Sequence, residues 1–276
     1  MNCLTVNLKF LVLEVLLLLS LPVIYGYTLS KKKNDPSMVY YTYKVEDQVM
    51  QYAETGNDSL PLVLFVHGAP GSAANYKRYL NDTLLQKKAH LIAVDRPGYG
   101  GSQKGYTVTS IEKQARFIQK VMAKNKSNKP AVLVGHSYGG PIVARIAMDY
   151  PNEVGALVMQ APAVDPNNEK KWFVNKPIDK KWVRWALPKP IRVSNDEKLS
   201  HPEELEKMLP LWHTLTIPIV HIHGTKDSIV PFENMTFVEN KAVNANLKVV
   251  RVENASHFIP WEYFNLSKKH ILSFLD

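Results

Sequence analysis

A serine flanked by glycines stands where an apolar run ends, in the stretch GHSYG (residues 135–139). The preceding residues 131–134 (AVLV) predict a short buried strand, because small and β-branched apolar side chains suit both faces of a sheet. Residues 142–149 follow with helical spacing. A strand that turns directly into a helix leaves room only for glycine two positions before and after the turning residue. We therefore predict that Ser137 is a nucleophile, raised above the sheet at the positive end of a helix.

A serine hydroxyl is a weak nucleophile unless a histidine removes its proton and a carboxylate orients that histidine. Two later segments supply these groups: Asp227 lies in GTKDSIVP and His257 lies in ENASHFIPWE, and each follows a predicted strand. Ser, then Asp, then His, each just beyond the carboxyl end of a separate strand, is the order typical of one hydrolase architecture. Asp165, just past an earlier predicted strand, is the alternative acid.

A loop earlier in the chain can supply the remaining group that acyl transfer needs. LVLFVHGAPGS (residues 62–72) predicts a strand followed by a tight loop. Such a loop can direct a backbone N–H at a developing oxyanion. We expect His67 to orient this loop rather than to react, and Asp95 and Arg96 to brace the neighbouring loop. His136 is expected to pack or to form a local hydrogen bond.

These motifs together resemble the α/β-hydrolase family, and the resemblance covers most of residues 38–276. The HGAPG, DRPGYGGS, GHSYGG, GTKDSIVP and SHF segments all match the family's pattern. The resemblance assigns reacting groups to five residues, with Ser137 as the nucleophile, Asp227 as the acid, His257 as the base, and the backbone N–H groups of Ala69 and Tyr138 as the oxyanion hole. It assigns supporting positions in the surrounding loops to His67, Gly68, Gly135 and Gly139.

The nucleophile position separates branches of this family. Epoxide hydrolases and haloalkane dehalogenases share the HGxP loop but place an aspartate where this chain has Ser137. The resemblance therefore implies an acyl-enzyme intermediate and a carboxylic ester substrate, a small molecule with a lipid-like character as one option, and no cofactor. The alternatives are C–C bond hydrolysis, amide hydrolysis or perhydrolysis on the same triad. A further alternative is a non-catalytic binding protein, in which the serine has no chemical role.

Strands alternate with helices along the chain after an antiparallel hairpin expected at 38–55. This alternation predicts an α/β fold with a mostly parallel sheet and helices on both faces. The family resemblance implies eight strands and a small helical cap inserted after the sixth strand. We expect the first part of the core at 34–165, the cap at 166–208 and the second part of the core at 209–276.

The first 33 residues do not resemble the rest of the fold. Residues 10–27 are apolar on all sides, apart from Glu14, and polar residues follow them. The segment is long enough for the apolar region of a signal peptide and near the lower limit for a membrane-spanning helix. We expect residues 1–33 to form a signal peptide or a membrane anchor with a polar linker. The protein would then be exported, as a secreted or periplasmic protein, or anchored in a membrane.

Composition restricts the other chemistry that the chain could carry. The chain has 276 residues, a net charge of +9 and one cysteine, Cys3, so the domain has no thiolate zinc site or catalytic cysteine. His221 and His223 lie two apart on a predicted strand, but no third ligand accompanies them, so we expect no metal site.

Much of the positive charge is concentrated in one segment. Residues 169–192 combine eight Lys and Arg with three Trp, a pattern that suits an anionic membrane surface or a solvated face. No nucleic-acid recognition motif accompanies the charge, so we expect no nucleic-acid binding.

Overall fold

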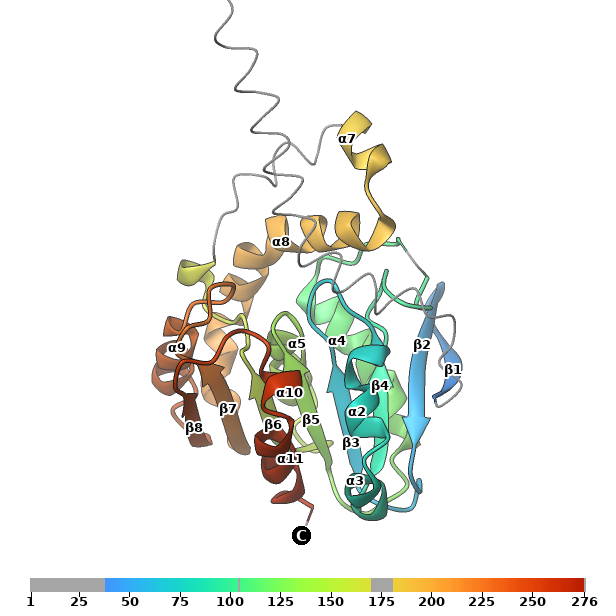
Figure 1. Cartoon of the computed structure of the whole chain (residues 1–276), viewed down its shortest axis with the longest axis vertical. Helices are drawn as coiled ribbons and strands as arrows, with labels where there is room; N and C mark the ends of the chain where they lie inside the picture. Colours follow the sequence, from blue (N-terminus) through green and yellow to red (C-terminus); the bar gives the residue numbers. More distant parts are fainter. Residues whose placement is uncertain (1–37, 104, 170–180, 276) are drawn as a thin grey trace, which may run out of the picture.

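A computed structural model describes residues 38–103, 105–169 and 181–275 of the chain, with the side chains of 181–183 left out. Within these residues the chain forms one sheet with helices packed on it (Figure 1). The predicted signal or anchor segment at 10–27 lies outside the described residues, as do residues 170–180 of the basic segment 169–192. In the described part of the chain, no helix is long and apolar enough to cross a membrane.

The described residues form an eight-stranded sheet in the order β1-β2-β4-β3-β5-β6-β7-β8. The first two strands form the predicted antiparallel hairpin, β2 pairs antiparallel with β4, and every other pairing is parallel. The prediction of a mostly parallel α/β sheet is therefore confirmed. The strands are β1 (Val39–Val45), β2 (Gln48–Thr55), β3 (Leu62–Val66), β4 (His90–Val94), β5 (Ala131–His136), β6 (Val154–Gln160), β7 (Pro218–Gly224) and β8 (Asn246–Val252).

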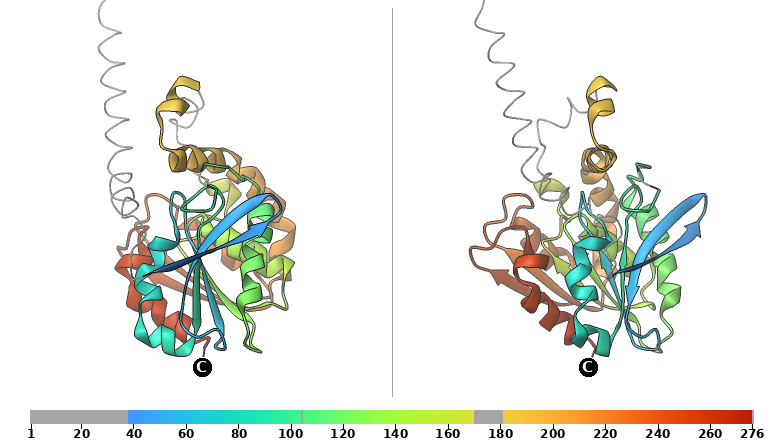
Figure 2. Two further views of the ribbon diagram at one scale, coloured as in Figure 1. Left: turned by 90° about the vertical axis from the view of Figure 1, so that its right-hand side faces the viewer. Right: turned by 45° about the vertical axis from the view of Figure 1, so that its right-hand side comes forward.

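Every residue of the central strands β3, β4 and β5 is buried, because helices cover both faces of the sheet (Figure 2). One apolar cluster lies between the sheet and the helices α4 (Ile111–Gln119), α5 (Gly139–Asp149) and α9 (Glu233–Lys241). A second cluster lies on the opposite face. The helices on that face are α2 (Lys77–Leu80), α3 (Thr83–Lys88), α10 (Ile259–Glu262) and α11 (Phe264–Leu272).

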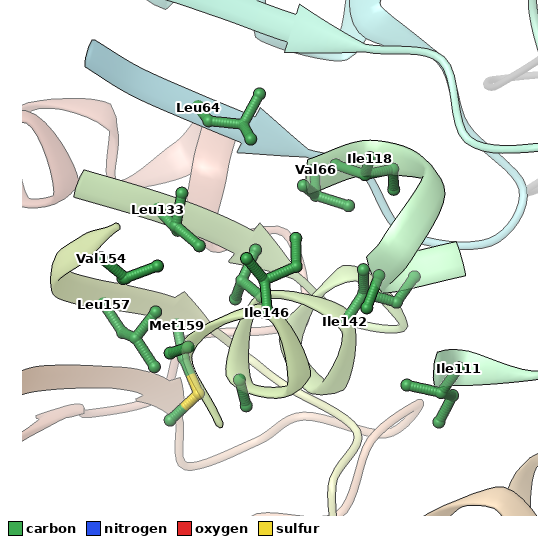
Figure 3. Close-up of a cluster of buried hydrophobic side chains, with 14 of the residues drawn as sticks. Leu64, Val66, Ile111, Ile118, Leu133, Ile142, Ile146, Val154, Leu157 and Met159 are labelled. Carbon is green, nitrogen blue, oxygen red and sulfur yellow. The ribbon is translucent and has the colours of Figure 1, made fainter. Parts of the chain in front are cut away.

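The first cluster holds the helix that follows Ser137 against the sheet. Ile142 and Ile146 of α5 pack with Leu133 of β5 and Leu64 of β3 (Figure 3). All four side chains are fully buried. The position of the strand-to-helix turn is therefore set by side chains on both sides of it.

The predicted helical cap lies between β6 and β7. It contains a short 3-10 turn, η3 (Pro166–Asn168), and the helices α7 (Lys181–Ala186) and α8 (Lys189–Met208). A further 3-10 turn, η4 (Leu209–Thr214), leads back to the sheet. Figure 1 shows α8 lying across one end of the sheet, with α7 beyond it.

The predicted helices are broken more often than their apolar spacing indicated. The spacing of apolar residues predicts one helix over 73–88, but the structure divides this stretch into η1 (Ala73–Tyr76), α2 and α3. The break before α3 has a local cause, because the Asp82 carboxylate accepts hydrogen bonds from the Leu84 and Leu85 N–H groups and caps a new helix. The same spacing predicts a helix over 109–124, and this helix ends as a 3-10 turn, η2 (Lys120–Lys124).

Replacing Leu133 with alanine tests the packing between β5 and α5. We expect Leu133→Ala to lower the free energy of unfolding by about 3 kcal/mol, because the vacated volume is fully enclosed. The matched control is Leu84→Ala, at a side chain on α3 that is 44% exposed, with an expected change below about 0.5 kcal/mol. Urea denaturation measures both changes. Equal losses of stability in the two variants would contradict the proposed contribution of Leu133 to the packing between β5 and α5.

Candidate active site

Ser137 occupies a crowded turn between β5 and α5. Its φ angle is +53°, in the left-handed region that non-glycine residues rarely adopt. A Cβ atom on Gly135 would lie 2.5 Å from the carbonyl oxygen of Gly139. A Cβ atom on Gly139 would collide with the carbonyl oxygen of Val66. The two glycines therefore let the chain reverse here, as predicted from their spacing.

Backbone hydrogen bonds hold the strained residue in place. The Ser137 N–H donates to the carbonyl of Gln160 at the end of β6, at 3.0 Å. The Ser137 carbonyl accepts from the N–H groups of Gly140, at 2.9 Å, and Ala163, at 3.2 Å. The side chain is half-buried. Strain held by surrounding hydrogen bonds is typical of a functional position.

Asp227 and His257 are in direct contact, although 30 residues separate them in the chain. His257 Nδ1 lies 2.6 Å from Asp227 Oδ2, and both residues are buried. The other carboxylate oxygen accepts hydrogen bonds from the N–H groups of Ile229 and Val230. Burial alone would raise the pKa of Asp227, but hydrogen bonds from His223 and His257 hold that pKa well below its usual range. Asp227 is therefore a carboxylate that fixes the proton of His257 on Nδ1 and leaves Nε2 as an acceptor.

His136, the neighbour of Ser137, connects the serine turn to the histidine loop. Its Nε2–H donates to the carbonyl of His257 at 3.1 Å, and the two rings lie 4.7 Å apart. Burial lowers the pKa of His136 to about 3, so the ring is neutral and has one N–H to donate. The expectation that His136 packs is confirmed, since its buried ring contacts His257 and Trp261, but its hydrogen bond is not local, because the bonded residues lie 121 positions apart.

Asp165, the alternative acid, uses its carboxylate within its own turn. Its carboxylate accepts hydrogen bonds from the Asn167 N–H, at 2.9 Å, and from the Asn168 amide, at 2.7 Å. These bonds begin η3. Because both carboxylate oxygens of Asp165 are already hydrogen-bonded in this turn, Asp227 is the better candidate for the partner of a catalytic histidine.

The loop after β3 passes directly over the serine turn. A Cβ atom on Gly68 would lie 2.9 Å from the Ser137 Cβ, so only glycine permits this approach. The Gly68 carbonyl accepts two hydrogen bonds, from His67 Nδ1 at 2.7 Å and from Arg96 Nη2 at 3.1 Å. Burial lowers the pKa of His67 well below its usual value, and the ring is neutral. His67 and Arg96 thus orient and brace the loop, and the Ala69 N–H lies on the opposite side of a fixed peptide.

Tyr138 follows the serine, and a histidine of α8 packs on its side chain. Its buried ring stacks on His201 of α8 with 4.4 Å between ring centroids, and Arg96 lies 4.7 Å from the same ring. Residues of α8 were not among the predicted site residues. The polar, proline-punctuated segment around them carries no periodic pattern that would mark them.

The two histidines of β7 contact each other rather than forming a recognisable metal site. His221 Nε2 lies 3.1 Å from His223 Nδ1, and His223 Nε2 lies 3.3 Å from Asp227 Oδ2. Among residues 38–103, 105–169 and 181–275, no group of three metal-ligating side chains is positioned to hold an ion. Both histidines therefore form part of the surroundings of Asp227.

Comparison with known proteins identifies the architecture. The sequence model of the alpha/beta hydrolase fold family matches residues 61–196. Among solved structures, the epoxide hydrolase CorEH superposes with a TM-score of 0.70 at 18% identity, covering 86% of this chain and 98% of that one. The monoacylglycerol lipase of Paleococcus ferrophilus superposes with a TM-score of 0.66 at 20% identity, covering 82% and 98%. The chain therefore has the α/β-hydrolase fold.

The curated proteins that the sequence resembles match only part of the chain. The chain is 25% identical to the palmitoyl-protein thioesterase ABHD10 of Bos taurus, over 71% of this chain and 67% of the relative. It is 28% identical to the human monoacylglycerol lipase ABHD6, over 63% and 50%. It is 35% identical to a rice protein named as a probable 1-acylglycerol-3-phosphate O-acyltransferase, over 38% and 26%. The chain thus spans a half or less of the human and rice relatives.

Replacing Gly139 with alanine tests the crowding at the serine turn. We expect Gly139→Ala to lower the free energy of unfolding by about 3 kcal/mol, because the new methyl group must displace the backbone of β3. The control is Gly155→Ala in β6, where the nearest atom would be a Pro130 side-chain carbon at 3.3 Å. Thermal unfolding compares the two. If Gly139→Ala is as stable as the control, a methyl group at position 139 does not collide with the backbone of β3 as we expect.

Proposed function

We propose that the protein is a serine hydrolase that cleaves a carboxylic ester through an acyl-enzyme. One observation carries this proposal: a buried Asp227–His257 pair at 2.6 Å is hydrogen-bonded through His136 to the strained turn at Ser137. A nucleophile, a base and an orienting carboxylate are the groups that acyl transfer by serine needs.

In the proposed mechanism the three residues act in a fixed order. Ser137 Oγ attacks the ester carbonyl while His257 Nε2 takes its proton, and Asp227 stabilises the imidazolium that forms. The N–H groups of Ala69 and Tyr138 stabilise the oxyanion, an effect worth about 3 kcal/mol per donor in a related site. His257 then gives the proton to the leaving alcohol. Water, activated by His257, attacks the acyl-enzyme and releases the acid. No cofactor takes part in this scheme.

The names of the relatives support an acyl substrate with lipid character. A thioesterase and two monoacylglycerol lipases are among the proteins that the chain resembles, and their names describe cleavage of acyl esters or thioesters. Likeness to an epoxide hydrolase fold makes epoxide opening the second candidate. A serine at position 137, where that branch of the family has aspartate, favours the acyl-enzyme route.

Removing the Ser137 hydroxyl tests the proposal. We expect Ser137→Ala to lower kcat for a p-nitrophenyl ester by at least about a thousandfold, because no other group then forms the acyl-enzyme. The control is Ser273→Ala, whose hydroxyl donates to the His270 carbonyl in the C-terminal turn, and which should keep full activity. Steady-state kinetics on folded protein measure both. A Ser137→Ala enzyme that retains most of its activity would sink the proposal.

A matched pair of substitutions tests which aspartate is the acid. Asp227→Asn should lower kcat by about a thousandfold or more, because an amide cannot stabilise the His257 imidazolium and permits the wrong tautomer. Asp165→Asn should change kcat by less than about threefold, because asparagine caps a helical turn as well as aspartate does. The same ester assay compares them. The reverse ranking would transfer the acid role to Asp165.

A further inference from the structure

A buried ion pair joins the cap helix α8 to Arg96, which also forms hydrogen bonds to the loop that carries Ala69. Arg96, two residues after β4, and Glu197, on α8, meet through two contacts: Nη1 to Oε1 at 2.6 Å and Nη2 to Oε2 at 3.1 Å. Both side chains are fully buried. The two residues lie 101 positions apart in the sequence.

The ion pair is part of a hydrogen-bond network in which every donor of Arg96 is used. Besides Glu197, the guanidinium donates from Nε to the His67 carbonyl at 2.9 Å, from Nη1 to Gln114 Oε1 at 2.9 Å, and from Nη2 to the Gly68 carbonyl at 3.1 Å. A guanidinium has five N–H donors in a rigid fork. All five have acceptors here, so the group has one orientation that satisfies it.

Glu197 is equally saturated. Its Oε1 also accepts a hydrogen bond from the Gln114 amide at 2.9 Å, and its Oε2 accepts one from the Tyr99 hydroxyl at 2.6 Å. A buried charge that loses its partner is strongly destabilising. Glu197 therefore determines where the Arg96 fork can lie.

The peptide between Gly68 and Ala69 transmits this constraint to the site. A trans peptide is planar, and its C=O and N–H point in opposite directions. Arg96 Nη2 and His67 Nδ1 both hold the Gly68 carbonyl. By fixing the carbonyl on one side, they fix the direction of the Ala69 N–H on the other.

We infer that Glu197 is a positioning residue: through Arg96 and the Gly68 carbonyl, the cap helix sets the direction of the Ala69 oxyanion donor. The inference rests on the proposed function, because Ala69 matters for catalysis only if an oxyanion forms at Ser137. If the inference holds, the Ala69 N–H has a fixed direction only when α8 is in the position that the structure shows. The cap then contributes to the chemical step.

Two substitutions, one at each partner of the ion pair, test the inference. Glu197→Gln keeps the shape but removes the charge that orients the fork, and Arg96→Lys keeps a charge but cannot reach Glu197 and the Gly68 carbonyl together. The control is Asp196→Asn, one residue earlier on α8, which breaks the partly exposed ion pair with Arg184. Kinetics are measured at a temperature where circular dichroism shows all variants folded.

A positioning role predicts a particular kinetic pattern. Both site variants should lose about tenfold or more in kcat, because a misdirected donor stabilises the oxyanion poorly. KM for a short soluble ester should change by less than about threefold, since the ground-state carbonyl depends little on that donor. The pH dependence of kcat should keep its midpoint, because Asp227 and His257 are untouched. Activity equal to that of Asp196→Asn in both folded variants would overturn the inference.

A crystal structure of Glu197→Gln gives a readout that does not depend on hydrolysis. We expect the Gly68–Ala69 peptide to rotate or to lose its single orientation as Arg96 withdraws. An unchanged peptide, with the Arg96 Nη2 bond to Gly68 intact, would overturn the inference whatever the ester assay shows. If Ser137→Ala instead keeps its activity, the proposed function fails, while the crystal structure still decides whether Glu197 positions the loop.

Discussion

The site depends on the close approach of three backbone segments at the carboxyl end of β5. The serine turn, the start of α5 and the loop after β3 meet where side chains would collide, so glycine stands at Gly68, Gly135 and Gly139. Buried apolar side chains of β5 and α5 pack against one another and hold the strand and the helix in place. The packing of the core thus sets the left-handed conformation of Ser137.

Polar groups around this turn are fixed rather than mobile, because burial makes unpaired groups costly. Asp227 receives hydrogen bonds from two backbone N–H groups and a histidine besides His257, so its carboxylate has little freedom to turn. Burial lowers the pKa of His136 and His67, which keeps both rings neutral as hydrogen-bond donors. Donors held in place before the reaction need not reorganise as charge develops, which is the main source of catalysis in such sites.

Local patterns in the sequence predicted the sheet and the candidate triad, whereas the contacts that connect them were not predictable in that way. Apolar runs such as 131–134 identify buried strands, and the GHSYG motif identifies a turn whose sterics demand glycine. The His136–His257 bond and the Arg96–Glu197 pair join residues more than a hundred positions apart. Their partners depend on how the loops fold back over the sheet. The break before α3 was not predicted because a polar residue at position 82 is also compatible with the exposed side of one longer helix. In the structure, Asp82 instead caps a new helix.

The central claim is that Ser137 forms a covalent intermediate, and mapping an adduct tests it most directly. The full chain is treated with a fluorophosphonate, which reacts with an activated serine, and is then digested and sequenced by mass spectrometry. The account predicts one modified residue, Ser137, and loss of ester hydrolysis in proportion to its modification. Modification of a different residue, or continued hydrolysis by fully modified protein, would contradict the account.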